Sequence, residues 1–188
     1  MTKSLDEQRA EFSRRRFLAM PLAGTVAWTL IGVASLFSTP FQIIWVTFIA
    51  TGSIVYLGMA ISRFTGEHFL NGRALSNEFD KLFLMTVAMS ALVYSIAIPF
   101  FLIDNSSLPL TVGILTGLMW LPLSWMIKHW IGIFHAIVRT TFIVIAWYLY
   151  PANRFTVIPL VIVAVYLFSI VVLERRFKKL NIEGMSGG

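Results

Sequence analysis

Two side chains in a long apolar stretch have the types and spacing for binding chemistry. His135 precedes Arg139 by four residues, so on a helix the imidazole and the guanidinium lie on one face. An arginine in the middle of a membrane helix costs about 2.5–3.5 kcal/mol, and something must offset that cost. Neutral His135 can accept a hydrogen bond from the guanidinium. The pair predicts a site for an anion or carboxylate, or part of a proton path; the alternative is an Arg139 that snorkels toward lipid headgroups.

A second pair, Ser90 and Tyr94, also has helical spacing within an apolar stretch. We expect these two side chains either to line a cavity or to hydrogen-bond between helices. Together the two pairs give the predicted ligand-binding residues Arg139, His135, Ser90 and Tyr94.

Acidic residues are confined to the tails, the loops and the ends of the apolar stretches. This excludes a hydrolase with paired carboxylates inside the membrane, and it disfavours proton- or sodium-coupled carriers, which usually place a carboxylate there. If Arg139 has an ionic partner, the sequence offers Glu67, Glu78 or Asp80 from one loop, or a bound anion.

Catalytic and metal-binding signatures are missing from the sequence. The chain has no cysteine, and its three histidines are His68, His129 and His135, with no His-Glu-x-x-His and no Gly-x-Ser-x-Gly motif. We therefore predict no catalytic residues, no metal and no cofactor, which disfavours an enzyme.

The composition identifies the environment in which these side chains must act. Of 188 residues, 57% are apolar and only 13% are charged, whereas a soluble domain has roughly 25% charged residues. This excludes a soluble enzyme, a disordered chain and a nucleic-acid-binding module. The net charge of +6 is better explained by contact with anionic lipid headgroups of a bilayer.

Six apolar stretches have the length of a membrane-spanning helix, which needs about 20 residues. We expect an all-α transmembrane fold, a six-helix bundle over residues 17–173. A basic tail (residues 1–16) precedes it, a second basic tail (residues 174–188) follows it, and residues 63–81 form its one sizeable loop. The predicted spans are residues 17–38, 41–62, 82–103, 109–127, 132–150 and 156–173.

The distribution of Lys and Arg predicts the orientation. With six spans, thirteen basic residues fall on one side and one, Arg154, on the other. Basic loops stay in the cytoplasm, so both termini are expected to be cytoplasmic and the protein to lie in the inner (plasma) membrane. A competing signal, the twin arginines in residues 13–18, resembles an export signal, but no soluble domain follows it and the apolar stretch is too long.

Small residues at a spacing of four mark the expected helix contacts. Gly113 and Gly117 form a GxxxG motif, and Ala91 and Ser95 have the same spacing. We expect these pairs to pack inside one bundle; the alternative is a homodimer through Gly113 and Gly117. Pro99 and Pro122 lie inside predicted spans, where a kink could open a cavity.

One region resembles a known family. Gly117, Trp120, Pro122, the pair Ser124-Trp125 and Lys128, followed by a short break and another span, are similar to a family of small bacterial six-span membrane proteins of unknown function. The resemblance implies a bacterial inner membrane. Three functions remain open: a small carrier or channel around Arg139 and His135, a non-catalytic membrane partner, scaffold or accessory protein, and, least favoured, a lipid-modifying enzyme.

Overall fold

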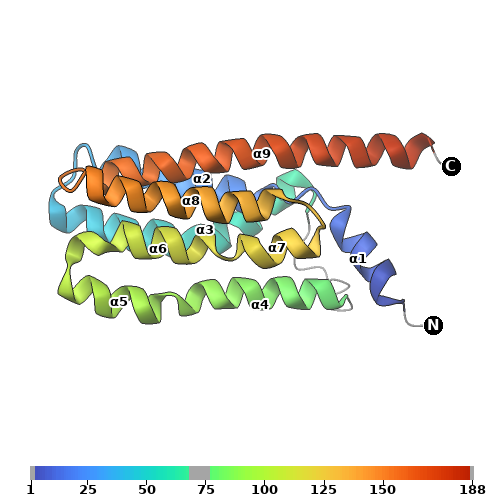
Figure 1. Cartoon of the computed structure of the whole chain (residues 1–188), viewed down its shortest axis with the longest axis horizontal. Coiled ribbons are helices and arrows are strands. Elements are labelled where there is room, and N and C mark those ends of the chain that lie inside the picture. Colours follow the sequence, from blue (N-terminus) through green and yellow to red (C-terminus); the bar gives the residue numbers. More distant parts are fainter. Residues whose placement is uncertain (1–2, 68–76, 187–188) are drawn as a thin grey trace.

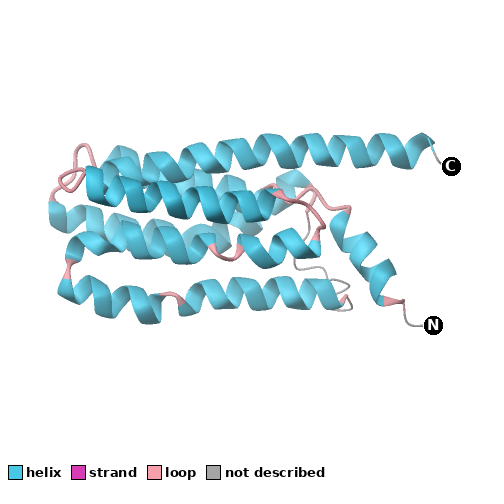
Figure 2. Ribbon diagram, viewed as in Figure 1, coloured by secondary structure: helices cyan, strands magenta, loops and turns pink. Residues whose placement is uncertain are grey.

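The computed structural model describes residues 3–67 and 77–186, which form helices and contain no strand (Figure 2). In chain order the helices are α1 (Leu5–Ser13), α2 (Ala19–Ala34), α3 (Pro40–Thr65), α4 (Glu78–Leu92), α5 (Tyr94–Ile103), η2 (Asn105–Ser107), α6 (Leu108–Gly117), α7 (Trp120–Met126), α8 (Ile131–Leu149) and α9 (Arg154–Ser186).

The helices form an elongated bundle in which successive passes run in alternating directions (Figure 1). Helix α2 packs against α3 and α9, and α8 packs against α9, α6 and α7. The α4–α5 pass lies at the edge, where it contacts α1, α6 and α7. Both chain ends lie at the same end of the bundle, and α1 is placed there beside the loops (Figure 1).

Five of the passes are long and apolar enough to cross a membrane. They are Pro40–Thr65, Glu78–Ile103, Asn105–Met126, Ile131–Leu149 and Arg154–Ile182. The predicted all-helical fold with apolar membrane-length helices is therefore confirmed. The first predicted span, residues 17–38, is realised as α2 with only 16 helical residues, a length of roughly 24 Å.

Polar caps explain where two of the passes begin and end. Thr39 and Gln42 form a capping box at the start of α3, and Gly66, with φ +76°, ends this helix. Asn77 caps α4, which begins at Glu78, four residues before the predicted start of that span. At the other end of the chain, α9 continues through the basic tail predicted to follow residue 173, because Lys and Arg are good helix formers.

Two passes that the sequence predicts to be continuous are broken. Helix α4 gives way to α5 at Val93, and α6 gives way to α7 at Leu118–Met119. Pro122 explains the second break, because it has no N–H for the carbonyl of Leu118, four residues earlier. The first break is less directly explained, because the proline of that pass, Pro99, lies inside α5, six residues after Val93.

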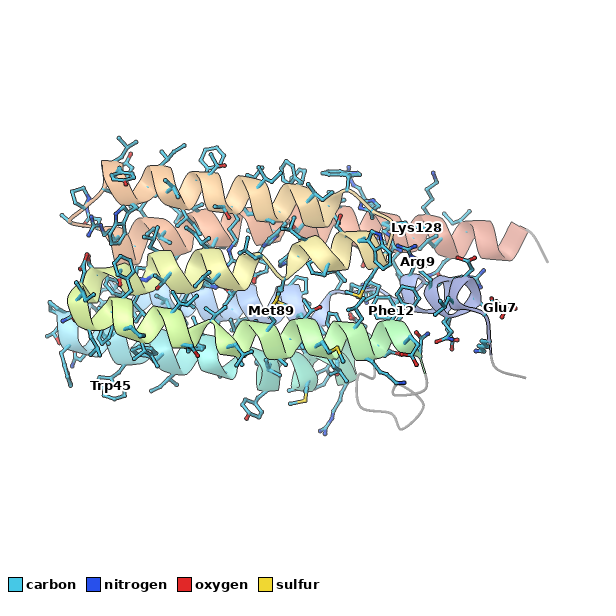
Figure 3. All side chains as sticks on the ribbon, turned by 60° about the horizontal axis from the view of Figure 1, so that its bottom comes forward. Glu7, Arg9, Phe12, Trp45, Met89 and Lys128 are labelled. Atoms are coloured by element: carbon cyan, nitrogen blue, oxygen red, sulfur yellow. The ribbon has the colours of Figure 1, made fainter. Side chains whose placement is uncertain are left out.

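The amino-terminal tail is structured by its own helix. Ser4 and Glu7 form a capping box at the start of α1. Phe12 is fully buried, and its ring lies 5.0 Å from that of Phe17 and 6.2 Å from that of Phe79. Figure 3 shows Phe12 and Arg9 on α1 at the bundle end, near Lys128, whereas Trp45 lies on the outside of α3 near the opposite end.

Candidate functional site

Arg139 lies in the interior of the bundle with no exposed surface, held by side chains from three helices. Its Nη1 donates to the Tyr166 hydroxyl at 3.1 Å, and its Nη2 donates to the Thr116 hydroxyl at 3.1 Å. His135 Nε2 is 3.4 Å from Nη1, and His135 Nδ1 is 2.9 Å from the Ser169 hydroxyl. The predicted pair therefore belongs to a five-residue polar cluster of α6, α8 and α9.

Aromatic rings enclose this polar cluster. The Trp120 ring stacks on the His135 ring with centroids 3.8 Å apart and an angle of 9° between planes. The guanidinium carbon of Arg139 is 5.2 Å from the Tyr166 ring and 5.8 Å from the Trp28 ring. Aromatic faces attract cations, more strongly in a dry interior. The rings therefore offset part of the cost of burying the charge.

No carboxylate lies within ion-pair distance of Arg139 among the described residues, and its Nε has no hydrogen-bond partner there. The acidic side chains predicted as partners are used elsewhere: Glu67 at the backbone of Leu18 and Ala19, Glu78 with Lys81, and Asp80 with Arg15. The guanidinium is thus stabilised by neutral acceptors and aromatic rings alone. Such an arrangement leaves a net positive charge inside the bundle.

The GxxxG glycines pack inside the bundle, next to this charge. A Cβ on Gly117 would lie 3.0 Å from Cδ of Arg139, and a Cβ on Gly113 would lie 3.1 Å from Ile143 and Ile162. Gly117 therefore makes the room that Arg139 occupies. The other small residues, Ala91 and Ser95, are exposed on the α4–α5 pass.

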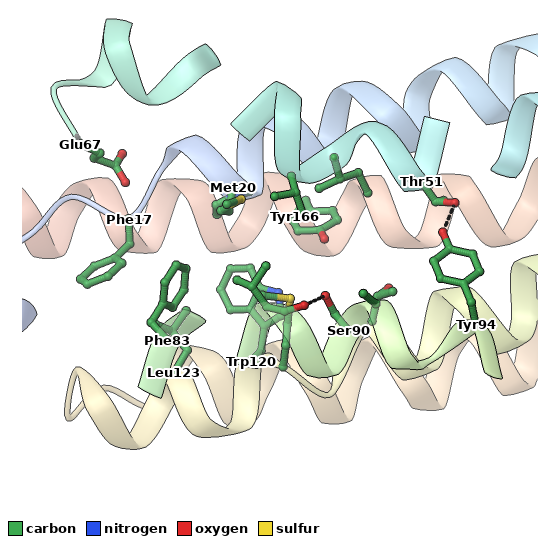
Figure 4. A pocket seen from close by; sticks show the side chains of 18 residues that line it. Phe17, Met20, Thr51, Glu67, Phe83, Ser90, Tyr94, Trp120, Leu123 and Tyr166 are labelled. Carbon is green, nitrogen blue, oxygen red and sulfur yellow. Dashed lines mark hydrogen bonds between the residues drawn. The ribbon is translucent and has the colours of Figure 1, made fainter. Parts of the chain in front are cut away.

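A cavity of about 130 Å³ lies beside the polar cluster, between α2 and α3 on one side and the α4–α5 and α6–α7 passes on the other (Figure 4). Most of its wall is apolar. The polar groups that line it are Thr51, Glu67, Ser90, Tyr94, Thr116 and Tyr166. Ser90 and Tyr94, which the sequence selects, both belong to this wall, and Tyr94 shares a 2.7 Å hydrogen bond with Thr51.

Two features connect the cavity to the rest of the site. Thr116 and Tyr166 belong to both the cavity wall and the Arg139 cluster. The Arg139 guanidinium is therefore separated from the cavity by these two side chains, to which it donates hydrogen bonds. The wall also includes residues that flank both helix breaks, Tyr94 at one and Met119 at the other. Irregular backbone at membrane depth is tolerated where it lines a cavity or is buried in protein.

Glu67 is a lining residue that sequence reasoning missed as part of a cavity. It follows the Gly66 turn, so its side chain reaches back to the first turn of α2, where Oε1 accepts from the N–H groups of Leu18 (2.8 Å) and Ala19 (3.1 Å). Its Oε2 is buried without a partner among the described residues. Burial raises the pKa of Glu67, partly opposed by those backbone hydrogen bonds, by the Thr65 hydroxyl and by Arg16.

Metal binding finds no support in the described part of the chain, where no three potential ligands gather. His135 is used within the polar cluster, and His129 Nδ1 accepts from the N–H of Ile131 at 3.3 Å. The remaining histidine, His68, lies outside the described residues.

A bundle of apolar helices around an internal polar cluster and a cavity defines a class of protein compatible with a membrane. Within that class, the chain belongs to a family of unknown function, DUF7010, whose model matches residues 5–176. This membership agrees with the resemblance to a family of unknown function that begins at Gly117. No curated protein and no solved structure matches the chain.

Proposed function

We propose that the protein is an inner-membrane protein with six spans and cytoplasmic termini that binds a small apolar or amphiphilic molecule within its bundle, as a carrier does. The observation that supports this most directly is the cavity, which lies where two passes are interrupted and is lined by both apolar and polar side chains. Interrupted helices that frame a midplane site are typical of transporters.

Orientation in this proposal follows from charge. Basic side chains of both tails gather at the end of the bundle where both termini lie, and Arg154 is at the other end. Cytoplasmic placement of the basic end would let it contact anionic headgroups. The cavity then extends from Glu67, on the cytoplasmic side, to Thr51 and Tyr94, deeper in the bundle (Figure 4).

In this proposal the α4–α5 pass is the element that moves to open the cavity. Only 11% of its apolar window is buried inside the chain, the smallest share of the five candidate spans. Few contacts restrain such an element, so its displacement costs little. Outward movement of this pass would connect the cavity with the lipid.

Blocking the cavity tests the proposal. Gly52 lines it, and a Cβ at this position meets nothing within 4 Å, so Gly52→Leu places a side chain in the cavity from a position with room for its Cβ. We expect octan-1-ol to raise the melting temperature of the purified wild-type protein but not that of Gly52→Leu. Ala60→Leu, on the exposed side of the same helix, is the control and should respond like wild type. Equal responses from Gly52→Leu and wild type would refute binding in this cavity.

The alternative function is a non-catalytic partner or scaffold, and the exposed α4–α5 pass favours it as a surface for another membrane protein. The same variant separates the two. A partner function is retained in Gly52→Leu, whose change is inside the cavity, whereas a carrier function is lost.

A further inference from the structure

The Glu67 carboxylate is the acidic group in the cavity wall, and one of its oxygens has no hydrogen-bond partner among the described residues. The side chain is only 6% exposed, Oε1 is occupied by two backbone N–H groups, and Oε2 is buried without a partner among the described residues. A buried carboxylate oxygen without a donor is costly. This atom therefore has unused capacity for a hydrogen-bond donor or a cation.

The surroundings of this oxygen suit an organic cation. Figure 4 shows Glu67 and Phe17 at one end of the cavity, with Phe83 and Leu123 nearby. Phenylalanine faces attract ammonium groups, and the apolar wall beyond them accommodates a hydrocarbon body. Arg139 does not line the cavity, because Thr116 and Tyr166 stand between its guanidinium and the open space.

We propose that the cavity binds a lipophilic organic cation, with its ammonium group on Glu67 and its apolar body directed along the cavity, and that this cation exchanges with a proton on Glu67. The inference rests on the proposed function and names its ligand class. In the exchange, the Glu67 carboxyl O–H bond breaks and its proton leaves to solvent. The ammonium ion takes its place beside the resulting carboxylate, so the charge at the site is unchanged.

The charged groups around Glu67 are engaged in contacts of their own. Arg16, whose charge lowers the pKa of Glu67, is held by Glu174 of α9 at 2.8 and 2.9 Å. Arg15 is paired with Asp80 of α4, and Arg176 of α9 donates to the Ser13 carbonyl. The hydrogen bonds from Arg16 lower the pKa of Glu174, whereas burial raises the pKa of Glu67.

Three probes with one tail test the proposal: octylammonium, octan-1-ol and octanoate, bound to the full chain in nanodiscs. We expect octylammonium affinity to rise with pH and its binding to release up to one proton, measured by calorimetry in two buffers of different ionisation enthalpy. Glu67→Gln keeps an acceptor for the α2 backbone. In this variant octylammonium should bind at least tenfold more weakly and without pH dependence, while octan-1-ol binding is unchanged.

Glu78→Gln, which removes an exposed carboxylate from the same end of the bundle, is the matched control and should bind octylammonium like wild type. Octanoate binding as tight as octylammonium, or octylammonium binding unaffected by Glu67→Gln, would overturn the cation proposal. In either case octan-1-ol binding that is lost in Gly52→Leu would still support the cavity itself. If none of the three probes binds, the proposed function fails together with this inference.

Discussion

Arg139 shows how a single glycine makes a buried charge sterically feasible. The guanidinium stem passes over Gly117, where a Cβ would approach Cδ to 3.0 Å. Its N–H groups then reach Thr116 on α6 and Tyr166 on α9. Since no described carboxylate compensates the charge, its position depends on this close approach and on the two hydroxyls.

A double-mutant cycle measures that dependence. Gly117→Ala should destabilise the wild-type protein by about 1–3 kcal/mol through overpacking. In an Arg139→Ala background the same change should cost nothing or stabilise slightly, because alanine is the better helix former. Thermal unfolding of the detergent-solubilised proteins gives the cost of Gly117→Ala in both backgrounds. Gly52→Ala, whose Cβ meets nothing within 4 Å, serves as the control and should behave alike in both backgrounds. A Gly117→Ala cost that is equal in the two backgrounds would show that Arg139 does not need this glycine.

The raised pKa of Glu67 predicts how stability changes with pH. Burial raises the pKa above its ordinary value of 4.5, so the unfolded chain releases this proton at lower pH than the folded chain. The stability of wild type relative to Glu67→Gln should therefore fall as the pH rises from about 4.5 through the folded pKa, and level off above it. A tenfold difference in acidity between the folded and unfolded chains corresponds to ~1.4 kcal/mol. Melting temperatures of wild type and Glu67→Gln over pH 4–9 give this difference. A difference that stays constant with pH would contradict the raised pKa.

At the scale of elements, hydropathy and turn residues predict most helices but not their interruptions. The apolar stretches correspond to passes because a membrane-length helix needs only local composition. Prolines at 99 and 122 predict interruptions in two passes. Only Pro122 lies close to a break, at Leu118–Met119, whereas the break at Val93 lies six residues before Pro99 and has no such local signal. The partners of Arg139 on α6 and α9 are likewise remote in sequence. The only sequence signal for Glu67 as a cavity residue is Gly66, because the turn at this glycine directs the Glu67 side chain back toward α2.

Helix α1 connects α4, which has few contacts with the rest of the bundle, to α7. Phe12 is fully buried against aromatic rings that include those of Phe79 and Phe83 on α4. On the other side of α1, Arg9 Nε donates to the Met126 carbonyl at 3.2 Å, and its guanidinium lies 4.1 Å from the Trp125 ring. One helix thus bridges α4 and α7.

Phe12→Ala should release this bridge. Removing a buried phenylalanine costs about 3–5 kcal/mol, which exceeds what a nine-residue helix can supply on its own. Backbone amides of α1 and of the first turns of α4 should therefore exchange with deuterium much faster, while those of α8 stay protected. Leu5→Ala, on the exposed face of α1 at 64% exposure, should leave the pattern unchanged. Protection of α1 retained in Phe12→Ala would refute its role as a bridge.

For the whole molecule, the central question is whether the short helix α2 crosses the membrane. It has 16 residues, but its neighbours are the membrane-length helices α3 and α9, with Trp28 and Ile31 fully buried between helices. The bundle also places both chain ends together (Figure 1), as an even number of crossings requires. Local thinning of the bilayer is a known response to a short hydrophobic helix.

Cysteine labelling decides the number of crossings, and the absence of natural cysteines makes each substitution a clean reporter. With six spans and cytoplasmic termini, Phe37→Cys and Ala152→Cys should react with a membrane-impermeant maleimide in intact cells. Ala10→Cys and Lys128→Cys should react only after permeabilisation. All four sites are exposed. If α2 does not cross, positions 10 and 37 must lie on the same side, because no other helix separates them. If both positions are labelled from outside, the protein has five spans and its amino terminus is not cytoplasmic. If one position is labelled from outside and the other only after permeabilisation, α2 must be a span.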